Sequence, residues 1–461
     1  MAYLLFMLAN AALFVRPAEL FPALGNLQIY LAFIGGAILC NLQGLQAQLR
    51  PRTLIQQPIN ICVIGVAVAV AVSHMASRGY LSGAFHGFVT MAKIALYYLM
   101  FVSVINTPQR LRQLMLVTAV CATIVVGASY LDFQKFKATW EGADETLVYK
   151  TLQEDMFLGE NEKILNHVIE TFGYDSLGNT KFVYRMRGLG IFNDPNDVAL
   201  LIAVAGMICL YFLTDTSLSL LRLAWLVPLA ILAIGYIETQ SRGGLLAIGA
   251  SGAVWASLRY GRKVAFALCA IGMLLAPVAL GRAAKIDVSD GTGQDRIQIW
   301  GEGLASIKSP AILFGHGEGE FEEIAGHVAH NSYIHAYVEL GFLGGTIFFG
   351  CFFLPAYAFF IIKYANVRIT DPELRRMLPF VAGILTAWGV GIASLSRCYA
   401  PSTYMVVALC AAFINLAGFH QRFPCPIVQW NTRTMRRLAF CSFGLLVASF
   451  AFVKVFARWG T

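Results

Sequence analysis

The chain has 461 residues, of which 58% are hydrophobic and 13% are charged, and its formal net charge is +8. A soluble protein of this length would carry about a quarter charged residues, so the composition excludes a soluble globular enzyme. Apolar stretches of roughly 20 residues recur along the chain and are long enough to cross a bilayer as helices. Basic residues in such a protein are typical of cytoplasmic loops and do not indicate a nucleic-acid partner.

The apolar stretches predict an all-α polytopic integral membrane protein with about 12–13 transmembrane helices, surrounded by membrane lipids. The first stretch lacks a basic leader and a small-residue cleavage site, so we expect it to be a retained span. The predicted spans lie roughly at 2–15, 27–43, 58–74, 84–105, 112–130, 197–214, 223–238, 243–258, 263–281, 336–362, 378–395, 402–418 and 438–456.

The ten cysteines lie mostly inside these spans, and the sequence contains no CxxC pair and no Cys/His cluster. A lone cysteine in apolar surroundings behaves as a small hydrophobic residue. We therefore predict neither a disulfide framework nor a zinc site.

The loops between the spans alternate in charge. One set of alternate loops holds most of the Lys and Arg residues, whereas the short loops of the other set hold one each: Arg16, Arg78, Arg242 and Arg397. The positive-inside rule places the basic set in the cytoplasm, with the N-terminus inside and the C-terminus outside. The predicted organisation is N-terminal spans at 1–130, a long outer loop at 131–196, spans at 197–281, a second long outer loop at 282–335 and C-terminal spans at 336–461.

The first outer loop ends in "YRMRGLGIFNDPNDVALL". Pro195 suits the first turn of a helix, and Asp194 is a candidate cap in front of it. The alternative is that Asp194 or Asp197 orients an arginine at the outer face.

Four arginines lie in or near the outer loops: Arg187, Arg242, Arg296 and Arg397. A guanidinium fork suits phosphate oxygens, and several together would hold a diphosphate. The alternative for each one alone is that it caps a helix or pairs with a carboxylate. The glycines of "SRGGLL" either open a helix start to an anion or allow close helix packing.

The second outer loop ends in "AHNSYIHAYVELGFLGG". A neutral imidazole at His330 can accept a proton from an attacking hydroxyl, and Asn331 can orient it or bind a sugar. His335 and Glu339 share a face if this segment is helical, and Glu339 is costly there unless it faces a cavity. The alternative is an interfacial histidine bonded to backbone. The spacing contains no HExxH pattern, so we predict no metal.

The motif His330–Asn331, nine residues, then Gly341-x-x-Gly344 resembles the signature of the bacterial O-antigen ligase and O-antigen polymerase family. "SRGGLL" and "DRIQIWGEGLASIKSPAILFGHGEGEF" resemble further parts of its shared domain. The resemblance implies a GT-C-like fold and a metal-independent, inverting inner-membrane glycosyltransferase without a cofactor. Such enzymes move a glycan from undecaprenyl diphosphate to an acceptor hydroxyl on the periplasmic side.

The resemblance assigns the essential histidine to His330 and the essential periplasmic arginines to Arg242 and Arg296. We expect seven further residues to bind substrate: Arg187, Asn331, His335, Glu339, Arg397, Asp194 and Asp197. A ligase would use lipid A-core as acceptor, whereas a polymerase would extend another lipid-linked glycan. The unusually long first outer loop also leaves a transferase acting on protein open.

A flippase or transporter of lipid-linked glycans is the main alternative from another class. Transporters place ionisable groups near the bilayer midplane. Lys93 is the one clear mid-span basic residue, and the other polar clusters gather on one predicted face. That distribution favours an enzyme.

Overall fold

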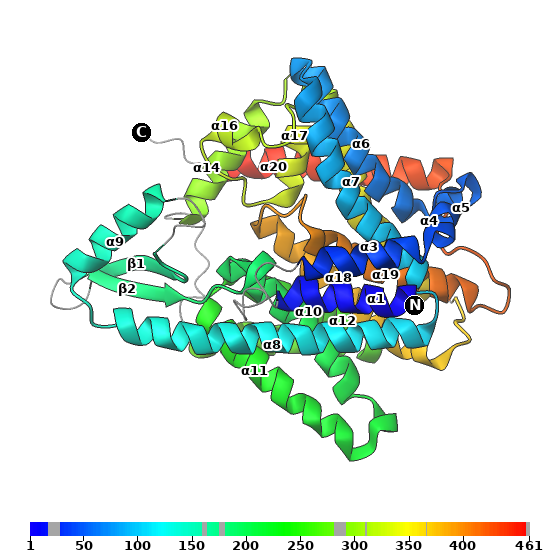
Figure 1. Cartoon of the computed structure of the whole chain (residues 1–461), viewed down its shortest axis with the longest axis horizontal. Coiled ribbons are helices and arrows are strands. Elements are labelled where there is room, and N and C mark those ends of the chain that lie inside the picture. The colour runs from blue at the N-terminus through cyan, green and yellow to red at the C-terminus, as the bar shows by residue number, and fades with distance from the viewer. Residues whose placement is uncertain are drawn as a thin grey trace.

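The structure, a computed structural model, describes residues 1–16, 28–158, 164–174, 180–280, 292–308, 311–365 and 367–457. In these ranges the chain forms a helical bundle with one two-stranded sheet (Figure 1). The all-α class is confirmed. The elements are α1 Ala2–Val15, α3 Ile29–Leu39, α4 Leu42–Gln48, α5 Pro51–Gln56, α6 Pro58–Arg78, α7 Leu81–Val104, α8 Pro108–Trp140, α9 Glu145–Phe157, β1 Val168–Tyr174, β2 Thr180–Arg185, η2 Gly190–Phe192, α10 Pro195–Leu213, η3 Thr216–Trp225, α11 Leu226–Thr239, α12 Arg242–Tyr260, α13 Arg262–Leu280, α14 Thr292–Ala305, α15 Ala311–Phe314, α16 Phe321–Ala325, α17 Ser332–Tyr364, α18 Pro372–Gly391, η5 Ile392–Ser394, α19 Pro401–Phe419 and α20 Thr432–Phe456.

Every predicted span falls on a helix. Among the described residues, nine helices are long and apolar enough to cross a membrane, and the pair α3–α4, bent by 75°, would be a tenth. The other predicted spans correspond to α1, which has only 14 residues, and to α12 and α13. The chain is therefore a multi-pass membrane protein.

Several helices begin where a side chain caps the free backbone amides of the first turn. Thr107, Asp194 and Asp371 each accept a hydrogen bond from an amide in the first turn of α8, α10 and α18, and a proline follows each cap. Proline suits this position because its missing N–H would have no helical partner there. These starts were readable from the sequence, as for Asp194 and Pro195.

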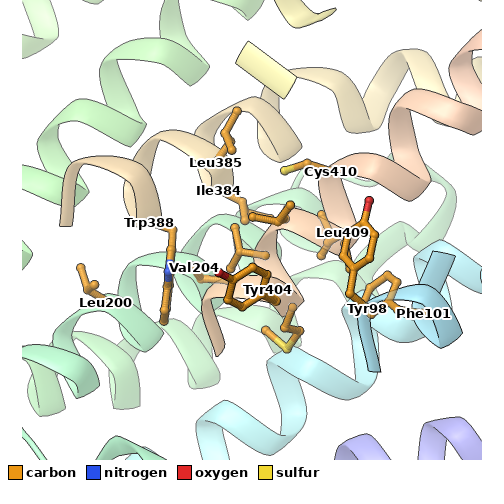
Figure 2. Packing of buried hydrophobic residues seen from close by; sticks show 14 of the residues in the cluster. Tyr98, Phe101, Leu200, Val204, Ile384, Leu385, Trp388, Tyr404, Leu409 and Cys410 are labelled. Atoms are coloured by element: carbon orange, nitrogen blue, oxygen red, sulfur yellow. The ribbon is translucent and has the colours of Figure 1, made fainter. Parts of the chain in front are cut away.

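The core lies where α10, α18 and α19 pack together with α7. Leu200, Trp388, Tyr404 and Tyr98 lie in this core (Figure 2), all nearly without exposure. The indole nitrogen of Trp388 is satisfied by Thr403 Oγ1 at 3.1 Å. In contrast, α11 and α20 expose apolar side chains along most of their length, as expected for helices that face lipid.

Basic loops meet at one end of the bundle, which we call the basic end. There Asp215 pairs with Arg112 at 2.7 Å and with Arg376 at 3.0 Å, which joins η3 to α8 and α18. The opposite end, which we call the loop end, is formed by the described residues 141–158, 164–174, 180–194, 239–242, 292–308, 311–330 and 392–400.

The first long loop contains structure that the sequence did not predict. Helix α8 continues past the predicted span to Trp140, and its 33 residues extend about 50 Å, well beyond the roughly 30 Å of a bilayer core. The antiparallel hairpin β1–β2 pairs Val168 with Arg185 and leads back to the bundle. The residue after β2 is bonded to α11, because the Met186 amide donates to Glu238 O at 2.9 Å. Residues 282–291 of the predicted second loop lie outside the described residues.

Candidate active site

His330 stands immediately before α17 with its backbone in the left-handed region, at φ 48°. Residues other than glycine rarely adopt this conformation, and it is concentrated at functional sites. Burial lowers the pKa of the imidazole to about 4, and the neighbouring charge of Arg296 adds to that effect. The imidazole is therefore neutral at ordinary pH and able to accept a proton.

Arg296, on α14, lies close enough for its charge to act on His330. Its Nη1 donates to Ser394 O at 3.5 Å. Burial lowers the pKa of Arg296 below its ordinary value, and the charges of Arg185 and Arg242 lower it further. Arg185 and Arg242 therefore share one neighbourhood with Arg296, in which Asp194 and Glu170 supply negative charge, and Arg296 in turn lies beside His330. Such a concentration of positive charge suits a phosphorylated ligand.

Arg242 is the first residue of α12, in the "SRGGLL" turn. Ser241 caps this helix, since its Oγ accepts from the Gly244 amide at 3.1 Å and donates to Asn196 Oδ1 at 2.7 Å. A side chain at Gly243 would collide with Ser394, and one at Gly244 with Ala199 of α10. The glycines therefore serve close packing, and that packing brings Arg242 toward Arg296.

Arg185 completes the cationic cluster and was missed by the sequence reading, which selected Arg187 two residues later. Its three nitrogens donate to Thr239 O at 3.0 Å, Glu170 Oε1 at 2.7 Å and Asn196 Oδ1 at 3.1 Å. One side chain thus joins β1, the start of α10 and the end of α11. The only signal in the sequence was a second arginine in "YRMRG".

Arg187 itself is half-buried, and its backbone amide donates to Nδ1 of His167 at 3.0 Å. Nε2 of that histidine lies 3.2 Å from Asp132 on α8. Burial lowers the pKa of His167. The buried His167, paired with the half-exposed Asp132, holds the segment after β2, and Arg187 remains a predicted substrate-binding residue.

Asp194 caps α10, because Oδ1 accepts from the Asn196 amide at 2.7 Å. Asp197 is only 2% exposed and forms a two-pronged ion pair with Arg397, in which Nε to Oδ1 measures 2.7 Å. The two alternatives drawn for these residues therefore coexist: one carboxylate caps a helix and the other orients an arginine. Arg397 also contributes to the field at His330.

Asn331 caps α17 by accepting from the amides of Tyr333 and Ile334 at 3.0 and 3.2 Å. Further along the helix, His335 Nε2 lies 2.9 Å from Glu339 Oε1. The fully buried Glu339 carboxylate also accepts from the Gly319 amide at 2.9 Å and from the Tyr399 hydroxyl at 2.8 Å. These contacts hold the second loop against α17.

The structure therefore brings together His330, Arg296, Arg242, Arg397 and Asp194, and adds Arg185. His335 and Glu339 lie further along α17 in an internal network. Among the described residues, no group of three or more His, Cys, Asp and Glu side chains is placed to hold a metal ion.

Comparison with known proteins identifies a domain that carries three residues of this site. Residues 227–349 match the family model described as O-antigen ligase, which confirms the family resemblance. No curated protein matches the chain. The matched segment contains Arg242, Arg296 and His330, whereas Arg185, Asp197 and Arg397 come from outside it.

Proposed function

We propose, from the O-antigen ligase family to which residues 227–349 assign the chain, that it transfers a glycan from undecaprenyl diphosphate to an acceptor hydroxyl. The reaction takes place at the loop end, which we assign to the periplasmic side of the bacterial inner membrane. The observation that carries the proposal is a neutral histidine in a strained backbone beside Arg296, which itself lies near Arg185 and Arg242.

In the proposed reaction the acceptor oxygen attacks the anomeric carbon from the face opposite the diphosphate. The bond from that carbon to the diphosphate oxygen breaks, and its electron pair leaves with undecaprenyl diphosphate. The hydroxyl proton passes to the His330 imidazole, a step that contributes about 10²–10⁴-fold in rate. Attack from the opposite face inverts the anomeric configuration.

Arg242 and Arg296 hold the diphosphate and stabilise the charge that develops as it leaves. Groups already oriented toward developing charge often contribute the largest share of catalysis. Burial of Arg296 strengthens its interaction with an anion, because the local dielectric constant is lower than that of water. Because guanidinium groups supply this charge, we propose a reaction that needs no metal ion or cofactor.

The other predicted residues divide into two groups in this proposal. Arg187 contacts the donor at the edge of the arginine cluster. Asp194, Asp197, Arg397, Asn331, His335 and Glu339 form caps, ion pairs and loop contacts that shape the site around the substrate.

Lipid A-core is the acceptor that we propose, which makes the protein a ligase. Joining of repeat units by a polymerase is the second candidate, because the matched family includes both activities. Surface glycans of a deletion strain, separated on a gel, distinguish them. Bare lipid A-core with full-length glycan retained on the carrier indicates a ligase, whereas single repeat units without long chains indicate a polymerase.

His330→Ala should abolish glycan transfer in the complemented deletion strain, because it removes the proton acceptor. The measurement is the same gel, with membrane insertion of the variant checked by immunoblot. Ser77→Ala, at an exposed position on α6, is the matched control and should restore wild-type glycan. Normal glycan from His330→Ala would refute the assignment.

A flippase is less well supported by the described residues. Lys93, the mid-span basic residue, is exposed on α7 and not enclosed between helices as a midplane transport site would be. Accumulation of lipid-linked donor on the cytoplasmic face of a deletion strain would favour a flippase. Accumulation on the periplasmic face is the outcome that we expect.

A further inference from the structure

The peptide group between Ala329 and His330 is bonded at both of its polar atoms. The indole Nε1 of Trp300 donates to Ala329 O at 2.6 Å, and the His330 amide donates to Ser396 Oγ at 2.9 Å. Ala329 is fully buried, so loss of either bond would leave a backbone group poorly satisfied. The side chains of Trp300 and Ser396, from two different segments, thus each form a hydrogen bond with one peptide group.

This peptide precedes the strained residue of the site. A left-handed backbone costs about 1–3 kcal/mol in a residue other than glycine and persists only where its surroundings hold it. On the other side of His330, the cap formed by Asn331 fixes the start of α17. The direction of the His330 side chain is therefore set by contacts on both sides.

The segment that carries Ser396 is itself held against α17. Ser332 Oγ donates to Leu395 O at 2.6 Å and accepts from the Arg397 amide at 2.7 Å. Ser332 has no exposed surface. The position of the Ser396 hydroxyl relative to His330 is thus fixed by two further hydrogen bonds.

We propose that Trp300 and Ser396 are positioning residues that clamp the Ala329–His330 peptide and so aim the imidazole at the acceptor hydroxyl. This inference rests on the proposed function of His330 as the proton acceptor. Trp300 belongs to α14, within the matched domain, whereas Ser396 follows η5, beyond it. Correct aim of the histidine therefore requires a turn that the family model does not cover.

The test uses four variants that separate the hydrogen bonds from side-chain bulk. Trp300→Phe keeps an aromatic ring and removes the N–H, Ser396→Ala removes the hydroxyl, Ser396→Thr keeps it, and Ser77→Ala is the exposed control. Membrane vesicles from the deletion strain provide initial rates, with native lipid-linked glycan extracted from that strain as the probe. Rates are normalised to the amount of folded protein.

We expect Trp300→Phe and Ser396→Ala to lower kcat by about 10–100-fold while leaving KM for the lipid-linked glycan unchanged, because a misaimed base impairs the chemical step. Ser396→Thr should restore most of the rate. The Trp300→Phe/Ser396→Ala variant should lose less than the product of the single losses, because both act on one peptide.

The pH profile separates this role from a general structural one. An imidazole released toward solvent has a pKa that rises from about 4 toward the ordinary value of about 6.5, and the acidic limb of kcat/KM moves with it. A variant that merely destabilises the fold scales the rate equally at every pH.

The outcomes distinguish this inference from the proposed function. Transfer by His330→Ala would overturn both. An inactive His330→Ala together with wild-type kcat and pH profile in Ser396→Ala and Trp300→Phe would overturn the clamp alone. The clamp would also be overturned if Ser396→Thr were as impaired as Ser396→Ala at equal amounts of folded protein.

Discussion

At the scale of single residues, His330 combines a left-handed backbone, a half-buried imidazole and an arginine neighbour. The first feature aims the ring, and the other two keep it unprotonated. A base with so low a pKa is a weak one, so the arginines must supply much of the catalysis by stabilising the leaving diphosphate.

The pH dependence follows from this environment. We expect the acidic limb of kcat/KM near pH 4 instead of near 6.5, because burial and Arg296 disfavour the charged imidazole in the free enzyme. Initial rates in vesicles between pH 4 and 8 check this. A limb near 6.5 in the wild-type protein would contradict it.

Stability should depend on pH in the same window. The folded pKa of His330 lies below that of the unfolded chain, so the unfolded chain binds more protons between about 6.5 and 4. The contribution of His330 to the free energy of unfolding is complete above about pH 6.5 and is lost as the pH falls through 4.

At the scale of elements, α17 is two helical pieces joined at Gly341, where φ is 67°. The break frees the carbonyl groups of Val338 and Glu339, which accept from the amides of His316 and Gly317 at 3.1 and 2.9 Å. The kink therefore serves as the docking point of the second loop. The positive φ at this kink explains why Gly341, the first glycine of the His330–Gly344 motif, is a glycine.

Gly341→Ala should lower the thermal unfolding temperature in detergent. The new side chain would be strained at positive φ, a cost of about 1–3 kcal/mol, and would collide with the backbone of residues 313–315. Gly249→Ala, on α12, meets nothing within 4 Å and is the matched control, expected to be neutral or slightly stabilising. Equal unfolding temperatures for the two variants would show that the kink does not need glycine.

At the scale of the whole molecule, the site is held together by contacts between segments far apart in the chain. Arg397 and Asp197 are separated by 200 residues and join the turn after η5 to α10. Arg185 joins the first long loop to the turn before α12. The first long loop is therefore structurally part of the site.

The ion pair makes a measurable prediction. Arg397→Gln should cost about 1–3 kcal/mol in stability, because it strands the buried Asp197 carboxylate, and solvent around the 34% exposed arginine keeps the cost below that of a fully buried pair. Asp197→Asn/Arg397→Gln should cost less than the sum of the single variants. Thermal unfolding in detergent measures the cycle, with the exposed Lys150–Glu154 pair as a control expected to show no coupling. Additive effects at Asp197 and Arg397 would contradict a stabilising interaction between the two side chains.

The sequence by itself determined the features that depend on neighbouring residues. The predicted spans fall on helices because hydropathy is a property of one continuous segment. The caps at Asp194 and Asn331 act within a single helical turn. Position and residue type therefore suffice to find such a cap, and the sequence predicted the one at Asp194. The histidine motif is likewise contiguous.

Only the tertiary structure decided which distant residues meet. Neither the partner of Asp197 nor the burial of Glu339 beneath the second loop can be read from local pattern, because both depend on how helices pack. Arg185 lies on β2, a short strand that pairs with β1, and helical periodicity does not reveal such a pairing. Packing also decides that the motif histidine is held by Ser396, 66 residues further along the chain.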